Sequence, residues 1–235
     1  MWNLDPPPGF QGLDPGKPIT AYQRHLPHWR QDGAAYFATF RLHDSLPQCK
    51  LRELEGIRAE WERRHSPPRS IEAIEDITRR VVEQVERWLD EGQGSCVLKE
   101  GRLAAHVTAG MHHFDGERYE LDCYCVMPNH VHVIVRPLFP DAHALEDILG
   151  AWRLFSSRRI NKELRRSGTL WQEESFDRII RDAEHLYRAI QYIGSNPDKA
   201  ALPRDACPLW IRPQWEALGW TFEWRKRDRE AGQGS

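Results

Sequence analysis

Two β-prone segments separated by only three residues constrain the fold of this chain more than any other feature. Arg118–Val126 and His130–Arg136 are rich in apolar and aromatic residues, and Met127-Pro128-Asn129 between them has the composition of a tight turn. The pattern therefore predicts a β-hairpin. An isolated hairpin is barely stable in water, so other parts of the chain must supply further strands or helices to cover it.

The remaining elements follow from their periodicity and their breakers. Tyr36–Leu42 alternates like a strand, and Thr169–Ile180 contains another strand. Helical spacing of apolar residues predicts helices over about 49–64, 70–91, 99–113 and 144–164, and a last helix that Asp182 caps and Pro197 ends. The order is strand, helices, strand, strand, helix, strand, helix. It predicts the α+β class, with a ferredoxin-like βαββαβ core, an antiparallel sheet with helices on one face, and an added C-terminal helix.

Composition shifts divide the chain into three parts. Residues 1–34 are rich in Pro and Gly and are expected to form an extended arm. Residues 35–202 carry the predicted core, with a helical insertion at about 49–92. Residues 203–235 form a tail that contains four tryptophans.

Bulk properties point to a cytoplasmic protein. No apolar run approaches the ~20 residues needed to cross a bilayer, so no membrane partner is expected. The first residues lack the basic and apolar regions of a signal peptide. The 5 cysteines are an odd number and are scattered along the chain, which fits a reducing compartment better than a disulfide framework.

The global charge of −2 gives no hint of nucleic-acid binding, but one helix does. Between residues 151 and 166 a single acid, Glu163, stands among basic residues, namely Arg153, Arg158, Arg159, Lys162, Arg165 and Arg166. Such a face is the usual electrostatic footprint for phosphate. A charged helix face that merely keeps the protein solvated is the alternative.

His130 and His132 are the first candidate functional residues. Alternate side chains of a strand share a face, so both imidazoles point the same way, about 7 Å apart along the strand at ~3.3 Å per residue. On a sheet with helices on one face only, they would lie on the open surface. Two converging neutral imidazoles suit a divalent metal, although two ordinary histidines would give the same pattern.

The last predicted helix presents polar groups beside its apolar stripe. At ~100° per residue, His185, Tyr192 and Asn196 fall within about 40° of one another. Tyr192 could therefore reach over the sheet, and Asn196 could offer an amide oxygen to a hard metal ion. Because a residue before proline is disfavoured in a helix, the position of Asn196 next to Pro197 leaves its geometry open.

Several motifs in one order resemble those of the REP-associated tyrosine transposases, the single-tyrosine branch of the HUH (His-hydrophobic-His) nucleases. They are Tyr36–Leu42, Val126–Ile134, Leu170–Gln172, Phe176–Arg178 and Tyr192–Pro197. The resemblance covers about 35–202. The insertion at 49–92 is longer than a minimal member needs, and the tryptophan-rich tail lies outside the matched core.

The resemblance implies a function and a set of residues. Tyr192 would be the nucleophile, and His130, His132 and Asn196 would hold Mg²⁺ or Mn²⁺. The substrate would be single-stranded or hairpin DNA from REP-like palindromes, cleaved and rejoined through a 5′-phosphotyrosine by a monomer or homodimer. The basic helix would hold the DNA backbone, together with Arg178 and Arg181. His185 could assist Tyr192, and Trp152 or Trp171 could stack on bases, although core packing is the alternative for both.

Two other functions remain open. Cys123 and Cys125 flank the hairpin with His130 and His132, and together these residues could form a structural zinc site. Alternatively, the chain could be a domesticated nucleic-acid-binding protein that no longer cleaves its ligand.

Overall fold

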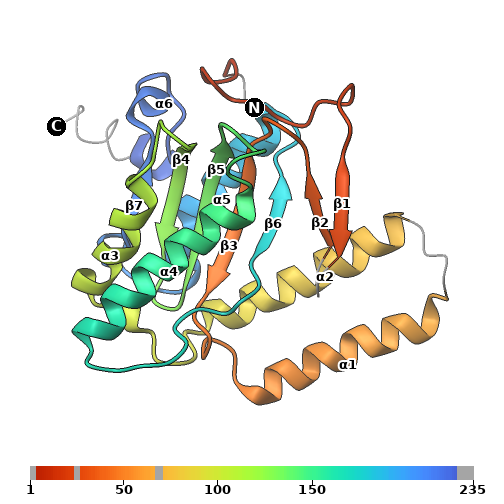
Figure 1. Ribbon diagram of the computed structural model, residues 1–235, viewed down its shortest axis with the longest axis vertical. Coiled ribbons are helices and arrows are strands. Elements are labelled where there is room, and N and C mark those ends of the chain that lie inside the picture. Colours follow the sequence, from red (N-terminus) through yellow and green to blue (C-terminus); the bar gives the residue numbers. More distant parts are fainter. Residues whose placement is uncertain (1–3, 24–26, 67–70, 227–235) are drawn as a thin grey trace.

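An antiparallel sheet forms the centre of the protein (Figure 1). The computed structural model describes residues 4–23, 27–66 and 71–226. In spatial order the strands of this sheet are β6 (Phe176–Ile179), β3 (Tyr36–Arg41), β5 (His130–Pro137), β4 (Tyr119–Val126) and β7 (Leu209–Ile211). All neighbouring pairs are antiparallel. Without β7, the order is that of a ferredoxin-like βαββαβ unit, so the predicted α+β class is confirmed.

Helices cover both faces of the sheet. The two core helices, α3 (Gly101–His112) and α4 (Leu145–Glu163), pack on the face that carries Val131 and Val133. The last long helix, α5 (Ala183–Lys199), covers the opposite face and buries its stripe of Leu186, Ile190 and Ile193 there. The expected open face is therefore wrong, because the apolar stripe of α5 has to be removed from water.

The insertion consists of α1 (Gln48–Arg64) and α2 (Ile71–Asp90), as predicted. The end of α2 is anchored by Trp88 and Leu89, which pack with Leu46 in a small separate cluster. A short 3₁₀ helix, η1 (Val97–Lys99), leads from there into α3. Within the described residues, no helix is both long and apolar enough to span a membrane.

The N-terminal segment contains more than an extended arm. β1 (Thr20–Gln23) and β2 (Pro27–Arg30) form an antiparallel pair, so the prediction of an extended arm is wrong for these residues. A buried ionic contact fastens this pair to β6. Nδ1 of His28 lies 2.6 Å from Oδ1 of Asp177, and Arg30 donates to the same carboxylate.

The tryptophan-rich tail is part of the core. After a short 3₁₀ helix, η2 (Arg204–Ala206), β7 adds to the edge of the sheet, and α6 (Pro213–Ala217) follows. Trp215, Trp220 and Phe222 are almost fully buried against the α5 side of the sheet. The resemblance of the sequence to a known family does not extend to this tail, so its packing could not be expected from that resemblance. Trp215, Trp220 and Phe222 pack beside α5, whereas Trp210 packs against Tyr124 on the other face of the sheet.

Helix α5 does not end at Pro197 but continues to Lys199. Proline lacks the N–H that would bond the carbonyl four residues earlier, yet the helix tolerates this loss within its last turn. Asp182 caps the other end by accepting a hydrogen bond from the backbone N–H of His185, as predicted. Asn196 is consequently helical, one turn after Tyr192 and on the same side of α5.

The ionic contact of His28 predicts a pH-dependent stability. Burial opposes protonation, but the hydrogen bonds to Asp177 and Glu174 outweigh it and raise the pKa of His28 from 6.5 to about 9. The stabilisation is therefore full below pH ~6.5 and disappears as the pH rises through about 9. We expect His28→Gln to lower the free energy of unfolding by about 3 kcal/mol more at pH ~6 than at pH ~10. Denaturant unfolding at the two pH values measures this, and the exposed His43→Gln serves as the control. An equal loss at both pH values would contradict it.

The contact between the tail and α5 predicts a steric effect. A Cβ at Gly194 would lie 2.3 Å from Cδ1 of Phe222. We therefore expect Gly194→Ala to destabilise the protein by about 1–3 kcal/mol, the usual range for overpacking. Gly150→Ala on α4 is the matched control, because its Cβ meets nothing within 4 Å and alanine favours a helix. Thermal unfolding of both variants tests this; a neutral Gly194→Ala would show that the tail does not press on α5.

Candidate active site

His130 and His132 lie next to each other on the α5 face of the sheet. Their Nε2 atoms are 3.0 Å apart, and each residue is only 1% exposed. The shared face was predicted correctly from strand alternation. The predicted exposure was wrong, because α5 closes over this face.

Neighbouring side chains fix how each imidazole is held. Asn129 donates from Nδ2 to the carbonyls of Leu89 and Gln93 at the end of α2, so its Oδ1 must accept from Nδ1 of His130, 2.7 Å away. Nε2 of His130 then carries no proton, and its lone pair is directed at His132. On the adjacent strand, Thr39 lies opposite His132 and its hydroxyl is 2.8 Å from Nδ1 of that ring. Hydrogen bonds of this kind orient metal-binding histidines in other proteins.

Burial keeps both imidazoles neutral. It lowers the pKa of His130 from 6.5 to about 3, and it lowers the pKa of His132 well below 6.5. The positive groups of Lys199 and Arg178 contribute to the shift at His132. Both rings therefore have lone pairs available at neutral pH.

Tyr192 and Asn196 approach the histidines from α5. The ring of Tyr192 is half-buried and meets His132 edge-on, with 5.3 Å between ring centroids. Asn196 is fully buried and donates from Nδ2 to the carbonyl of Tyr192. Its Oδ1 lies on the side of His132 but makes no hydrogen bond of good geometry with any described residue.

The chemistry of these groups fits a divalent cation. The two Nε2 atoms are 3.0 Å apart, so a proton carried by one of them is shared with the other, and a cation could take the place of that proton. A buried carbonyl oxygen without a partner costs about 1–3 kcal/mol, and a metal ion would satisfy it. His130, His132 and Asn196 are thus brought together as the sequence predicted.

The alternative zinc site lacks support. Cys123 and Cys125 are buried on the same face, and Cys125 lies opposite His132 in the strand register. Nevertheless, no cluster of three His, Cys, Asp or Glu side chains able to hold a metal ion occurs among the residues described. The His, His and Asn set falls outside that kind of cluster because its third member is an amide.

Two charged groups beside Tyr192 were missed by the sequence reasoning. Glu86 of α2 makes a side-chain hydrogen bond with Tyr192, and Nζ of Lys199 lies 3.7 Å from the centroid of the Tyr192 ring. Burial and the charge of Glu86 raise the pKa of Tyr192 above its usual value of 10, so the phenol is protonated at neutral pH. The missed signal is that Glu86 occurs at helical spacing between Val82 and Leu89, an acid within an otherwise apolar face.

The predicted assistance from His185 finds no counterpart. Its Nδ1 instead accepts a hydrogen bond from the backbone N–H of Arg181, and burial lowers the pKa of this imidazole to about 4. Glu86 takes the place beside Tyr192 that the sequence reasoning gave to His185.

The predicted DNA-binding residues divide between two faces. Arg178 is exposed on the face that α5 covers, over the ring of Phe37 and near Tyr192, and the exposed Arg181 precedes α5. The residues of α4 lie on the opposite face. There Arg153 donates to the carbonyls of Gln172 and Glu173, whereas the others are exposed: Arg158, Arg159, Lys162 and Arg165.

The basic end of α4 still lies toward the end of the sheet at which β3 ends and β5 begins (Figure 1). The loop that follows α4 bonds to the end of β3, since Gln172 donates its backbone N–H to the carbonyl of Arg41. Arg41 lies opposite His130. Trp152 and Trp171 are buried core residues whose indoles donate to Tyr119 and Ser156, so the idea that they stack on bases is wrong.

Part of the chain matches a family of known proteins. Residues 103–196 match the family model described as "Transposase IS200 like". The matched segment contains His130, His132, Tyr192 and Asn196. No curated protein sequence matches the chain. A solved structure described as a REP-associated tyrosine transposase bound to a REP hairpin is similar, with 15% identity and a TM-score of 0.36 over 79% of this chain and 76% of that one.

The support that Asn129 gives His130 is testable. Asn129→Ala removes the acceptor that fixes Nδ1 of His130, so we expect the affinity for Mn²⁺ to fall about 10–100-fold. Isothermal titration with Mn²⁺ measures it. Asn161→Ala is the matched control, because that amide also bonds a loop carbonyl but lies on α4, away from the histidines. Unchanged Mn²⁺ affinity in a folded Asn129→Ala protein would refute the role.

Proposed function

Because residues 103–196 match the IS200-like transposase family, we propose that this chain cleaves and rejoins single-stranded DNA with a tyrosine nucleophile and a divalent metal ion. The observation that carries the proposal is the meeting of three kinds of group at one buried place. These are the paired Nε2 atoms of His130 and His132, the unpartnered Oδ1 of Asn196, and the phenol of Tyr192.

His130, His132 and Asn196 would hold the metal ion, Mg²⁺ or Mn²⁺. When bound, such an ion supplies Lewis-acid stabilisation to a non-bridging oxygen of the scissile phosphate. All three protein ligands are neutral, so the phosphate itself contributes the negative charge that the ion prefers. This arrangement favours DNA as the remaining ligand rather than a site closed by protein groups.

Tyr192 would attack the phosphorus through Oη. A bond forms between Oη and phosphorus, the bond from phosphorus to the 3′ oxygen breaks, and the leaving oxygen takes up a proton to become a free 3′-hydroxyl. The product is a 5′-phosphotyrosine ester. Because the ester retains the energy of the broken bond, a second 3′-hydroxyl can reverse the step and join a new strand. Such a reaction suits strand transfer better than hydrolysis.

The phenol must lose its proton as it attacks, since its pKa is raised. The hydrogen bond between Glu86 and Tyr192 supports the Glu86 carboxylate as the group that accepts this proton. The cationic groups of Lys199 and Arg178 lie near enough to stabilise the developing phenolate.

The DNA partner we propose is a single strand that carries a hairpin, as in REP-like palindromes. That choice follows from the sequence motifs. The exposed basic residues at the end of α4 provide a phosphate-binding surface beside the catalytic end of the sheet, and Arg178 extends it to Tyr192.

A covalent-adduct assay tests the nucleophile. Wild-type protein, incubated with hairpin oligonucleotides and Mn²⁺, should form an adduct that survives denaturing electrophoresis. Tyr192→Phe should abolish the adduct and leave oligonucleotide binding within about twofold, because only the reacting oxygen is lost. Tyr187→Phe is the matched control on the same helix, where the hydroxyl bonds Glu223 instead. An adduct that persists in Tyr192→Phe, or that forms without metal, would rule out the proposed chemistry.

A further inference from the structure

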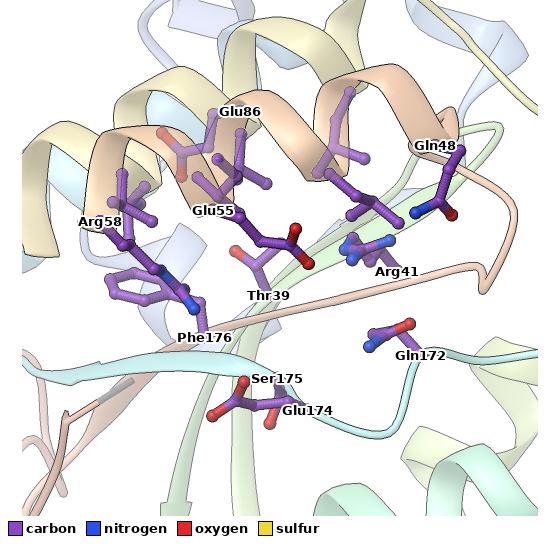
Figure 2. Close-up of a pocket in the computed structure, with 16 residues that line it drawn as sticks. Thr39, Arg41, Gln48, Glu55, Arg58, Glu86, Gln172, Glu174, Ser175 and Phe176 are labelled. Atoms are coloured by element: carbon purple, nitrogen blue, oxygen red, sulfur yellow. The ribbon is translucent and has the colours of Figure 1, made fainter. Parts of the chain in front are cut away.

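A cavity of about 260 Å³ lies between the inserted helices and the sheet. Figure 2 shows α1 and α2 above it, the end of β3 at its centre, and the segment before β6 below it. This cavity requires the insertion, because one whole wall comes from α1 and α2. The proposed roles of the metal-binding residues and of the basic helix do not assign a function to this cavity.

Strand register places the cavity on the catalytic face. Thr39 lies opposite His132, and Arg41 lies opposite His130. Residues directly opposite each other in an antiparallel pair share a face. Thr39 therefore serves both places: its hydroxyl contacts Nδ1 of His132, and the residue also lines the cavity. Glu86 likewise lines the cavity while it contacts Tyr192.

The two walls of the cavity differ in chemistry. The helices present an apolar surface that includes Leu51, Leu54 and Val85. The opposite side and the rim are polar, and in Figure 2 Glu55, Arg41 and Gln172 extend toward the middle of the space. A flat ring with polar edges matches this combination, since apolar side chains cover its faces and hydrogen-bonding groups meet its edge.

The guanidinium group of Arg41 has N–H donors that can reach a ligand in the cavity. Its Nη1 bonds the carbonyl of Leu42 and the hydroxyl of Ser45. No other hydrogen bond of its guanidinium is found within the described part of the chain, so Nε and Nη2 can donate into the cavity. Glu55 is an exposed carboxylate from the other wall and can accept.

We propose that this cavity binds one unpaired nucleobase of the DNA strand, next to the phosphate that Tyr192 attacks. The inference rests on the proposed function and names a part of its substrate. The volume is large enough for a single base. The charged lining consists of three carboxylates and two guanidinium groups, so the balance of charge disfavours a phosphate: Glu55, Glu86 and Glu174 against Arg41 and Arg58.

The carboxylate of Glu55 also gives a preference among bases. Carboxylates accept hydrogen bonds from exocyclic amino groups such as N4 of cytosine. Thymine has no amino group. The pocket should therefore prefer an amino-bearing base to thymine.

The test measures binding separately from cleavage. Tyr192→Phe protein, which should bind without reacting, is titrated at one fixed salt concentration with equally long strands of oligo-dC, oligo-dT and abasic deoxyribose phosphate. Fluorescence anisotropy gives the dissociation constants. Leu54→Trp, which fills the cavity, should reduce the preference for oligo-dC over the abasic strand about tenfold, the effect of losing one stacked base. Leu218→Trp, at a leucine that is 53% exposed elsewhere, should leave the preference unchanged.

A second pair of variants avoids any packing change. Glu55→Ala should remove the preference for oligo-dC over oligo-dT, whereas Glu53→Ala, on the same helix and outside the cavity, should retain it. If neither Leu54→Trp nor Glu55→Ala alters the preference while wild-type protein still forms covalent adducts, the pocket inference fails and the proposed function stands. If no strand binds the protein, both fail.

Discussion

The register between β3 and β5 determines which side chains meet at the site. Thr39 faces His132 and Arg41 faces His130 because these two strands pair at those positions. A slip of one residue would turn both histidines of β5 away from α5 and toward α3 and α4. The positions of the two histidines, of the Thr39 hydroxyl and of the arginine at the proposed base pocket thus depend on one set of backbone hydrogen bonds.

Burial determines the protonation state and the hydrogen bonding of the polar groups at this site. The imidazoles and the amide oxygen of Asn196 are removed from water, and burial keeps both imidazoles neutral. Polar groups in such a place cost stability unless they find partners. Two partners are built in, Asn129 and Thr39, whereas Oδ1 of Asn196 has none among the described residues. The proposed metal ion would supply the partner that this oxygen lacks.

Much of this architecture could be predicted from local pattern. Alternation along β5 placed His130 and His132 on one face, and helical spacing placed Tyr192 and Asn196 on one side of α5. The limits of such reasoning are also visible in particular residues. The pre-proline rule suggested that Asn196 had left the helix, yet α5 continues to Lys199. Propensity describes the average cost of a proline, and packing of the buried Asn196 and Pro197 outweighs it here.

Long-range contacts were beyond the reach of the sequence. Nothing local indicates that α2 would bring Glu86 to Tyr192, or that Asn129 would bond the carbonyls at the end of the same helix. The open face was a consequence of treating α5 as an addition to the fold. The core fold could be deduced from the order of the elements, whereas the covering of the face that carries His130 and His132 depends on which helix buries its stripe against which side of the sheet.

The hydrogen bonds that the tryptophan-rich tail makes determine when α5 acquires its full support during folding. Indole N–H groups of Trp215 and Trp220 donate to the carbonyls of Pro8 and Asp5, and Trp224 donates to the carbonyl of Gly194 on α5. The outer support of α5 is therefore assembled from the two ends of the described chain. During translation, the segment that carries Tyr192 leaves the ribosome before the segment that braces it. A nascent chain would thus hold Tyr192 on a helix that lacks this support until residues 215–224 have been synthesised and folded.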